Sequence, residues 1–216
     1  MNSSLTDNEP VHAGLFVSFE GGDGSGKSTQ VALLAAVFQA AGRQVVCTRE
    51  PGGTPLGEKL RELLMHGGKV DERAEALLYA ADRAQHVCEV VRPALNQDAV
   101  VISDRYSDSS VAYQGVGRGL DAYHIFKMSM WASRALIPDI TFVLDVDPEV
   151  ARKRLVKRGV GADRLEAAGD EFHQKVRKYF RDLTTQDSRC QLIDAAGSVE
   201  EVHERIMVAL KARGYL

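Results

Sequence analysis

The fold of this 216-residue chain is decided by the stretch Gly21-Gly22-Asp23-Gly24-Ser25-Gly26-Lys27-Ser28-Thr29. Its first eight residues read G-x-x-x-x-G-K-S, the pattern of a loop that binds phosphate groups through its backbone N–H groups. An apolar run, Leu15–Phe19, precedes this loop, and a run with helical spacing, Val31–Phe38, follows it. A strand before the loop and a helix after it form the context in which the pattern indicates nucleotide binding rather than a plain glycine turn.

Each residue type in this loop has a chemical reason to be there. Glycines allow the backbone N–H groups to turn toward an anion, and the following helix N-terminus adds a partial positive charge. Lys27 has the length to reach the β- and γ-phosphates of ATP, and the Ser28 hydroxyl is a ligand for Mg²⁺. We therefore expect Gly21–Thr29 to bind ATP.

Strand-like apolar runs alternate with helical patterns along the rest of the chain. Strands are predicted at 15–19, 44–48, 99–102, 140–144 and 191–193, and helices at about 27–41, 55–65, 72–95, 107–113, 121–136, 148–157, 170–186 and 198–213. This alternation predicts an α/β fold, a doubly wound five-stranded parallel sheet with helices on both faces and the ligand site at the carboxyl ends of the strands. We expect a flexible tail over residues 1–13 and a single domain over residues 14–216.

Composition excludes several classes of function. The chain has 27 Lys and Arg against 30 Asp and Glu, a net charge of −3, so it lacks the basic footprint of a nucleic-acid-binding protein. Three widely spaced cysteines form no C-x-x-C pair, which argues against a disulfide framework or a zinc site and fits a reducing cytoplasm. No apolar run approaches the length of a membrane span.

Charged residues follow the second and third predicted strands. Arg49, in the turn Thr48–Thr54, is either a cation for a second phosphate or a solvated surface arginine. Asp104 and Arg105 follow the strand predicted beside the phosphate loop, where a carboxylate serves a bound metal ion and a guanidinium binds phosphate, although the two side chains are also able to form an internal salt bridge.

Three further segments carry candidate ligand contacts. Tyr79 and Arg83 are four residues apart on one helix face, where the pair suits either a nucleobase or the edge of the core. The glycine-rich stretch 113–119 reads as a loop that could approach a ligand closely. Basic residues surround Gly159–Gly161, which indicates a short lid at about 157–168 or a solvated charged face.

Taken together, these stretches resemble the bacterial form of the thymidylate kinase family. The matching motifs, in the family's order, are F-E-G-G-D-G-S-G-K-S-T at 19–29, T-R-E-P-G-G-T at 48–54, S-D-R-Y at 103–106, A-Y-Q-G at 112–115 with G-R-G at 117–119, and D-R-L-E at 163–166. The R-E-P-G-G-T turn and the A-Y-Q-G stretch are the most specific of these.

The resemblance implies the P-loop nucleotide kinase fold and the transfer of a phosphoryl group from ATP to dTMP, with Mg²⁺, giving dTDP and ADP in dTTP biosynthesis. It also implies a homodimer, for which the apolar helical faces near 72–95 and 121–136 are candidate interfaces. From the composition we expect a cytoplasmic protein that binds neither nucleic acid nor a membrane. In its pattern the catalytic residues are Lys27, Arg105 and the lid arginines Arg158 and Arg164, and Ser28 and Asp104 hold the metal. The residues that it implies around dTMP are Asp23, Arg49, Glu50, Pro51, Tyr79, Arg83, Arg105, Ser110, Tyr113 and Gln114.

Three details of the resemblance concern single residues. The Glu50–Pro51 bond is a candidate cis peptide by analogy. Tyr79 stands where many family members have Phe, and Ser110 where some have Asn.

Two other readings remain at this point. A deoxynucleoside kinase shares the phosphate loop and the Asp-Arg pair and would need a carboxylate base after the second strand, for which Glu50 is available. A nucleotide-binding switch that hydrolyses ATP slowly would leave the acceptor-side and lid arginines unexplained.

Overall fold

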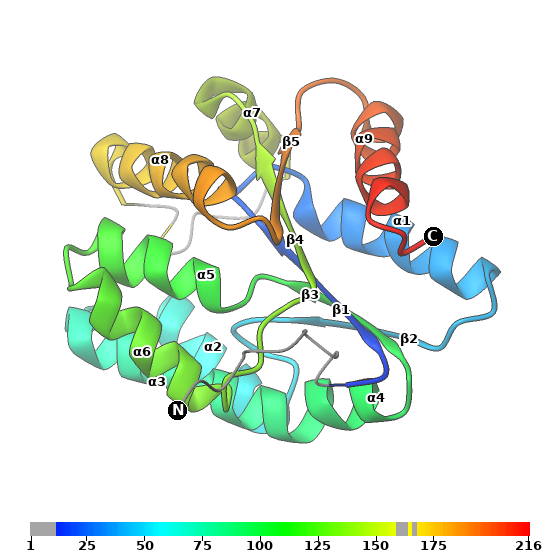
Figure 1. Cartoon of the computed structure of the whole chain (residues 1–216). Helices are drawn as coiled ribbons and strands as arrows, with labels where there is room; N and C mark the ends of the chain where they lie inside the picture. Colours follow the sequence, from blue (N-terminus) through cyan, green and yellow to red (C-terminus); the bar gives the residue numbers. More distant parts are fainter. Residues whose placement is uncertain (1–11, 159–163, 166–167) are drawn as a thin grey trace, which may run out of the picture.

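The computed structural model describes residues 12–158, 164–165 and 168–216, and of Arg158 only the backbone. Within them, five parallel strands form one sheet in the order β2-β3-β1-β4-β5 (Figure 1). The strands are β1 (Leu15–Glu20), β2 (Val45–Arg49), β3 (Val100–Asp104), β4 (Ile140–Asp145) and β5 (Cys190–Asp194). The predicted doubly wound parallel sheet is confirmed. Most of the predicted tail, residues 1–13, and of the predicted lid, about 157–168, lies outside the described residues.

Helices connect the strands, as the alternating pattern predicts. Their bounds are α1 (Lys27–Ala40), α2 (Pro55–His66), α3 (Glu72–His86), α4 (Arg92–Asn96), α5 (Ser107–Ser110), α6 (Ala122–Ala132), α7 (Pro148–Arg158), α8 (Asp170–Gln186) and α9 (Val199–Ala212). In the described part of the chain, no helix has the length and apolarity needed to cross a bilayer.

Two π-helical segments correct the predicted elements. The helix predicted at 72–95 is interrupted by a π-helical turn, η1 (Val87–Val91), between α3 and α4. The stretch that we expected to be a loop from residue 113 lies instead mostly in η2 (Val111–Gly117), which continues α5. Such wide turns are frequent at functional sites because they change which side chains face a ligand, and simple helical spacing does not reveal them.

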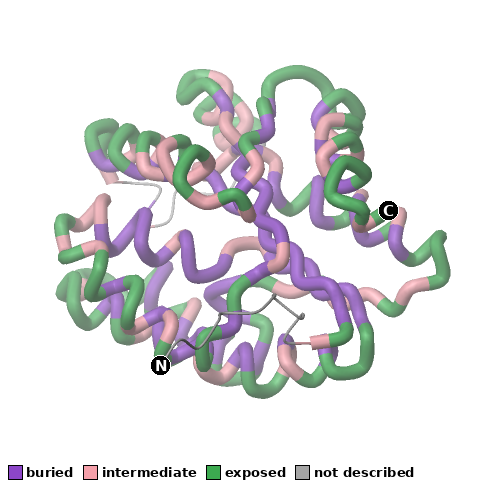
Figure 2. Tube along the Cα trace, in the orientation of Figure 1, coloured by how far each residue is buried: buried purple, intermediate pink, exposed green. Residues whose placement is uncertain are grey.

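The three central strands, β1, β3 and β4, are buried on both faces, which explains their apolar runs, whereas the edge strands β2 and β5 are partly exposed (Figure 2). Val17 and Phe19 of β1 pack toward α1 and α9 in one cluster, whereas Phe16 packs toward η1 and α4 in another. This alternation follows from the period of two along a strand.

Strand register sets the position of the site. Phe19 of β1 and Arg49 of β2 both lie opposite Asp104 of β3. The phosphate loop, the turn after β2 and the Asp104–Arg105 pair therefore leave the sheet at the same edge, as expected for a ligand crevice of an open α/β sheet.

Candidate active site

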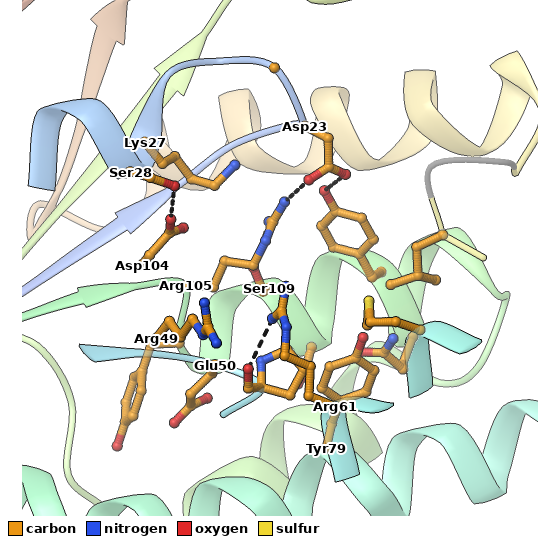
Figure 3. Close-up of a pocket in the computed structure, with 18 of the residues that line it drawn as sticks. Asp23, Lys27, Ser28, Arg49, Glu50, Arg61, Tyr79, Asp104, Arg105 and Ser109 are labelled. Carbon is orange, nitrogen blue, oxygen red and sulfur yellow. Dashed lines mark hydrogen bonds and ion pairs between the residues drawn. The ribbon is translucent and has the colours of Figure 1, made fainter. Parts of the chain in front are cut away.

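One cavity of about 680 Å³ lies at this edge and brings together most of the predicted site residues (Figure 3). Its lining includes Asp23, Gly24, Gly26, Lys27, Ser28, Thr29, Arg49, Glu50, Pro51, Tyr79, Arg83, Asp104, Arg105, Ser110, Tyr113 and Gln114. Lys27, Ser28 and Asp104 lie at one end, Tyr79 and Arg61 at the other, and Arg105 between them.

The phosphate loop has the backbone geometry that its glycines allow. Gly21, Gly24 and Gly26 have φ values of 124°, 76° and 98°, in the region that favours glycine. Gly26 is the N-cap of α1, so no side chain covers the first N–H groups of that helix. The buried Ser25 hydroxyl has no hydrogen-bond partner within the described residues. These free donors suit a bound polyphosphate.

The Lys27 side chain folds back across the phosphate loop and bonds to its backbone. Its Nζ donates to the carbonyl oxygens of Gly21 at 3.1 Å and Gly22 at 2.8 Å. Burial, and then the neighbouring charge of Arg105, lower the pKa of this amine. A phosphate anion would offer the ammonium a stronger partner than two carbonyl groups.

Ser28 and Asp104 form the candidate metal site. The Ser28 hydroxyl donates to Asp104 Oδ2 at 2.6 Å, across the ends of α1 and β3. Mg²⁺ takes oxygen ligands, usually one or two from protein and the rest from water and phosphate. One hydroxyl and one carboxylate beside a phosphate loop fit that requirement.

Arg105 forms an ion pair with Asp23 in the middle of the cavity. Arg105 Nη2 donates to Asp23 Oδ1 at 2.6 Å, and the Tyr113 hydroxyl donates to Asp23 Oδ2 at 3.4 Å. Although burial opposes it, the guanidinium of Arg105 and then Lys27 lower the pKa of Asp23 to about 2. The Arg105 guanidinium also lies over the Tyr113 ring, 4.9 Å from its centre.

The backbone at Arg105 is held in a left-handed conformation, with φ 73°. Non-glycine residues avoid this region, and where they occupy it they cluster at functional sites. The Arg105 N–H donates to the carbonyl of Phe19, and the Ser103 hydroxyl donates to the Arg105 carbonyl. The next N–H, that of Tyr106, donates to the buried carboxyl of Glu20 at 2.8 Å.

Glu20 also supports the side chain of Arg105. Arg105 Nη1 donates to the Ser109 hydroxyl at 3.1 Å, and that hydroxyl donates to Glu20 Oε2 at 2.5 Å. Burial, with a further contribution from Asp108, raises the pKa of Glu20 to about 7. Contacts from Glu20 therefore hold both the backbone and the guanidinium of Arg105 in place.

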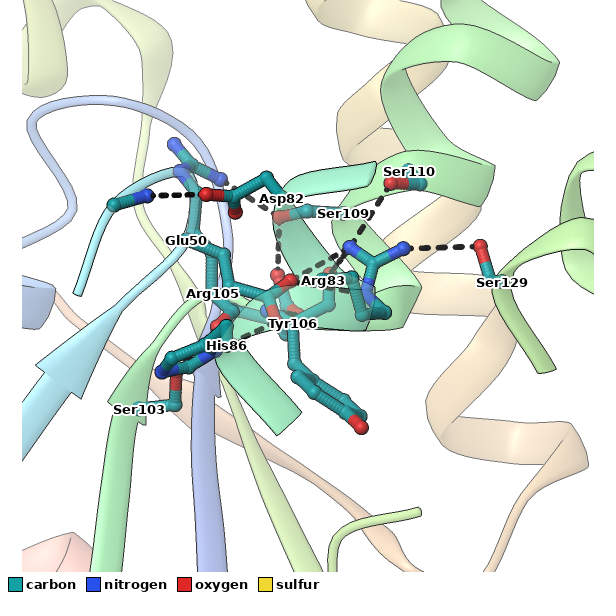
Figure 4. A network of polar contacts seen from close by, with 12 residues as sticks. Glu50, Asp82, Arg83, His86, Ser103, Arg105, Tyr106, Ser109, Ser110 and Ser129 are labelled. Carbon is teal, nitrogen blue, oxygen red and sulfur yellow. Dashed lines mark hydrogen bonds and ion pairs between the residues drawn. The ribbon is translucent and has the colours of Figure 1, made fainter. Parts of the chain in front are cut away.

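Arg83 and Glu50 form a buried network in the wall of the cavity (Figure 4). Arg83 donates twice to Glu50 Oε2, at 2.9 and 2.7 Å, and also to the hydroxyls of Ser110 and Ser129. His86 Nδ1 lies 2.9 Å from the other Glu50 oxygen. Burial opposes ionisation of Glu50, but the charge of Arg83 outweighs it and the pKa of this carboxyl is lowered. The Glu50–Pro51 bond is cis, as predicted.

Of the remaining predicted arginines, the structure describes the side chains of Arg49 and Arg164. Arg49 pairs with Glu58 at 3.1 Å in a half-exposed position. Arg164 donates to the carbonyl of Leu64 and pairs with Glu75 at 2.5 Å, away from the phosphate loop. The side chain of Arg158 lies outside the described residues.

Several site residues were not predicted from the sequence. Arg61 and Ser109 line the cavity, and Glu20 lies under Arg105. Arg154, one of the basic residues for which the sequence left a lid and a solvated face open, also lines the cavity and donates to the Ala195 carbonyl at 3.1 Å. The F-E-G-G run at 19–22 was the available signal for Glu20, whereas the other three side chains have no local pattern.

Asp82 lies beneath the turn after β2 and has an unusual proton affinity. Its Oδ1 accepts from the Gly52 N–H at 3.0 Å, and its buried Oδ2 has no partner among the described residues. Burial, and then the charge of Glu50, raise the pKa of Asp82 to about 7. The folded chain therefore holds a proton here between about pH 4 and pH 7 that the unfolded chain has released.

This raised pKa predicts a pH-dependent stability effect of Asp82→Asn. Because the folded state binds more protons than the unfolded state, the contribution of Asp82 to stability falls as pH rises through this window. Asn imitates the protonated acid, so the variant should gain stability relative to the parent chain by about 2 kcal/mol on going from pH 5 to pH 8. Urea unfolding of both proteins at the two pH values measures this gain. Equal pH dependence in the two proteins would contradict it.

The sequence matches known proteins of one family over nearly its full length. The family model for thymidylate kinase matches residues 19–206. The chain is 51% identical over 211 residues to a thymidylate kinase of Leifsonia xyli subsp. xyli (strain CTCB07), covering 97% of this chain and 99% of that protein. It is 53% identical over 204 residues to a thymidylate kinase of Bifidobacterium longum (strain NCC 2705), covering 92% and 98% of the two proteins.

A solved structure agrees with the sequence relatives. The crystal structure of thymidylate kinase from Ehrlichia chaffeensis superposes with a TM-score of 0.76 at 34% identity, covering 91% of this chain and 98% of that one. The likeness therefore covers most of both chains rather than a single motif.

Proposed function

Since the chain belongs to the thymidylate kinase family, we propose that it transfers the γ-phosphoryl group of ATP to dTMP, giving dTDP and ADP, with Mg²⁺. Membership of the family makes the chain a kinase that phosphorylates dTMP.

The observation that carries the proposal is the continuity of the cavity. The same space is lined by Lys27 of the phosphate loop, by Arg105, and by Tyr79 and Gln114 at the far end. ATP bound through the phosphate loop would place its γ-phosphate toward Arg105, and a nucleoside monophosphate would fill the space between Arg105 and Tyr79. Both reactants then share one site, as direct transfer requires.

Charge neutralisation is the main chemical task of this site. An oxygen of the dTMP phosphate attacks the γ-phosphorus, the bond to the β–γ bridging oxygen breaks, and ADP leaves with that oxygen. Lys27 and Arg105 bring positive charge to two anions that otherwise repel each other. An arginine of the predicted lid, Arg158 or Arg164, is the further cation that we propose at the transferred group.

Asp23 has a separate role in the acceptor site. In the structure the Asp23 carboxylate forms an ion pair with the Arg105 guanidinium. We propose that the dTMP phosphate replaces Asp23 on this guanidinium, and that the released carboxylate then contacts the sugar of dTMP. Arg49, Glu50 and Pro51 shape the wall of the same site, and Arg83 and Ser110 lie behind the base.

Ser28 and Asp104 are the residues that we propose hold Mg²⁺. When bound, this ion neutralises phosphate charge and orients the phosphate oxygens. The acceptor is already an anion, so the chain does not have to provide a strong general base.

Glu50 argues against the deoxynucleoside kinase alternative. A base that removes a proton from a sugar hydroxyl needs a free carboxylate oxygen, and both oxygens of Glu50 are engaged by Arg83 and His86. The lowered pKa of Glu50 makes it a weaker base still. We therefore propose that Glu50 holds the wall of the site in place and does not accept a proton from the substrate.

We propose that the chain is a homodimer in the cytoplasm. Trp131 of α6 is 81% exposed and Leu77 of α3 is 61% exposed, and Tyr123 and Phe126 of α6 are also exposed. Exposed apolar side chains on neighbouring helices are typical of a covered surface. All three cysteines are free thiols, which fits a reducing compartment. The mass of the protein in solution, by light scattering, tests the dimer.

Tyr113→Ala is predicted to weaken the preference for deoxyribose. The buried Tyr113 ring packs under Arg105 and against Phe172. We propose that the ring fills the space that a ribose 2′-hydroxyl would need. We expect the ratio of kcat/KM for dTMP to that for ribothymidine monophosphate to fall about tenfold or more, a size typical of a buried steric contact. Tyr113→Phe keeps the ring and should keep the preference. An unchanged ratio in the alanine variant would refute this role.

The proposed function is tested by ADP release with ATP, Mg²⁺ and each nucleoside monophosphate in turn, and with thymidine. Strong turnover with dTMP, and less with dUMP, supports it. Turnover with thymidine instead overturns the acceptor assignment, and ADP release without any acceptor dependence favours a nucleotide-binding switch.

A further inference from the structure

Glu75 is a fully buried carboxylate beside Gln114, a residue that lines the cavity, and it has no role in the proposed transfer. It lies in the first turn of α3 and contacts side chains from separate parts of the chain. Gln114 Nε2 lies 2.8 Å from Glu75 Oε1, Arg118 Nη2 lies 3.3 Å from Oε2, and Arg164 Nη1 lies 2.5 Å from Oε2. A buried charge is tolerated only with such partners, so this arrangement is specific.

The two arginines determine what Glu75 can do. Arg118 Nε donates to Oε1 at 3.4 Å, and Oε2 accepts from both Arg118 and Arg164. A guanidinium group has donors only, so both oxygens of Glu75 act as acceptors. A proton on either Glu75 oxygen would face an N–H donor of Gln114, Arg118 or Arg164, which is unfavourable.

This constraint fixes the amide of Gln114. The two ends of a glutamine amide differ only in that one donates and the other accepts. Because Glu75 Oε1 accepts, Gln114 must turn its NH₂ group toward it. The amide oxygen of Gln114 therefore faces away from Glu75, and within the described part of the chain no side chain or backbone group donates to it.

The free amide oxygen belongs to the end of the cavity that suits a base. Gln114 lines this cavity and bonds to Glu75, which lies one turn before Tyr79 on α3, whereas Lys27 lies at the opposite, phosphate end and Arg105 lies between the two ends (Figure 3). A nucleotide whose phosphate meets Arg105 must direct its base toward Tyr79 and Gln114. Thymine and uracil carry an N–H donor at N3, whereas cytosine carries an acceptor at N3.

We propose that Glu75 is a positioning residue that sets selectivity for dTMP over dCMP by fixing the Gln114 amide with its oxygen toward the base. This inference rests on the proposed function and adds a specificity determinant to it. Arg118 and Arg164 contribute by keeping Glu75 an acceptor. A pocket that presents an acceptor leaves two acceptors facing each other when cytosine binds, which is costly in a buried site.

Glu75→Gln tests this inference because it should raise the activity on dCMP, whereas general damage to the site would lower the activity on both nucleotides. The new amide keeps an oxygen for the arginines and presents NH₂ to Gln114, so the Gln114 amide should turn over and present its own NH₂ to the base. We expect the ratio of kcat/KM for dTMP to that for dCMP to fall roughly 10- to 100-fold, with a rise in activity on dCMP. Glu72→Gln, the same change at an exposed position one turn earlier, should leave the ratio unchanged.

A double-mutant cycle separates positioning from general destabilisation. Gln114→Leu removes the amide and should lower the ratio by itself, and adding Glu75→Gln to it should lower the ratio no further. An additional loss in the double variant, or an unchanged ratio in Glu75→Gln with normal thermal stability, overturns the inference. If Glu75→Gln does not fold, an unchanged ratio in Gln114→Leu alone overturns it.

Measurements on the unaltered protein separate a failure of the proposed function from a failure of the role of Glu75. Absence of dTMP phosphorylation by the unaltered protein would refute the proposed function itself. Normal dTMP phosphorylation by the unaltered protein, together with an unaltered ratio in Glu75→Gln, would refute only the role of Glu75.

Discussion

Replacement of Lys27 by methionine is expected to lower kcat by about 10³-fold or more while leaving the fold intact. The Lys27 ammonium is the cation of the phosphate loop, and within the described residues its hydrogen bonds go to two loop carbonyls. In the reaction it would lie on the β- and γ-phosphates, where charge develops as the bond to ADP breaks. Preorganised charge in a partly dry site stabilises a transition state by several kcal/mol, which is the source of the expected factor.

The measurement is kcat at saturating ATP and dTMP, with thermal melting as a check on folding. Methionine is chosen because it fills the buried space of the lysine stem without its charge. Lys211→Met removes the same charge from an exposed position on α9 and should leave kcat unchanged. Activity within tenfold of the parent chain in Lys27→Met would refute the role of Lys27.

Replacement of Arg105 is expected to be as damaging, but through the acceptor. Arg105→Ala should lower kcat/KM for dTMP by roughly 10³-fold, because the acceptor phosphate loses its charge-assisted donor in the middle of the cavity. Loss of the guanidinium also leaves Asp23 as an uncompensated carboxylate beside that phosphate. Both effects act on the same ligand, so KM for dTMP should rise while KM for ATP changes little.

A glycine at the same position separates chemistry from backbone strain. Arg105 has φ 73°, which glycine adopts without the cost that alanine incurs. Arg105→Gly should therefore lose as much activity as Arg105→Ala. Its free energy of unfolding should nevertheless be about 1 kcal/mol larger than that of the alanine variant. Near-normal turnover in either variant would rule out the proposed role, and equal stabilities would show that the backbone conformation costs nothing.

Both predictions concern residues that were recognised in the sequence, and the reason is local. Lys27 lies in a nine-residue pattern between a strand and a helix, and Arg105 directly follows a strand. Period and glycine placement decide such elements within a short stretch of chain. The parallel sheet and its order of winding then put both residues at one edge.

The structure decided which partner each charged side chain has. Arg105 pairs with Asp23, 82 residues away, and Arg164 lies on Glu75 instead of near the phosphate loop. A charged run such as 152–158 reads the same whether its arginines are solvated or line a cavity. Pairing depends on which segments pack together, and no pattern within either segment contains that information.

By itself, the sequence determined the phosphate loop, the number of strands, the helical connections and the resemblance to a kinase family, because these follow from local periodicity and short motifs. Tertiary structure alone decided the buried partners: Glu20 beneath Arg105, Asp82 beneath Gly52, and Glu75 behind Gln114. Asp82 and Glu75 look like ordinary surface acids in the sequence, and only the F-E-G-G run at 19–22 marks Glu20. Burial removes water from each of these carboxyl groups, so its properties and its role are set by the few groups that packing places beside it.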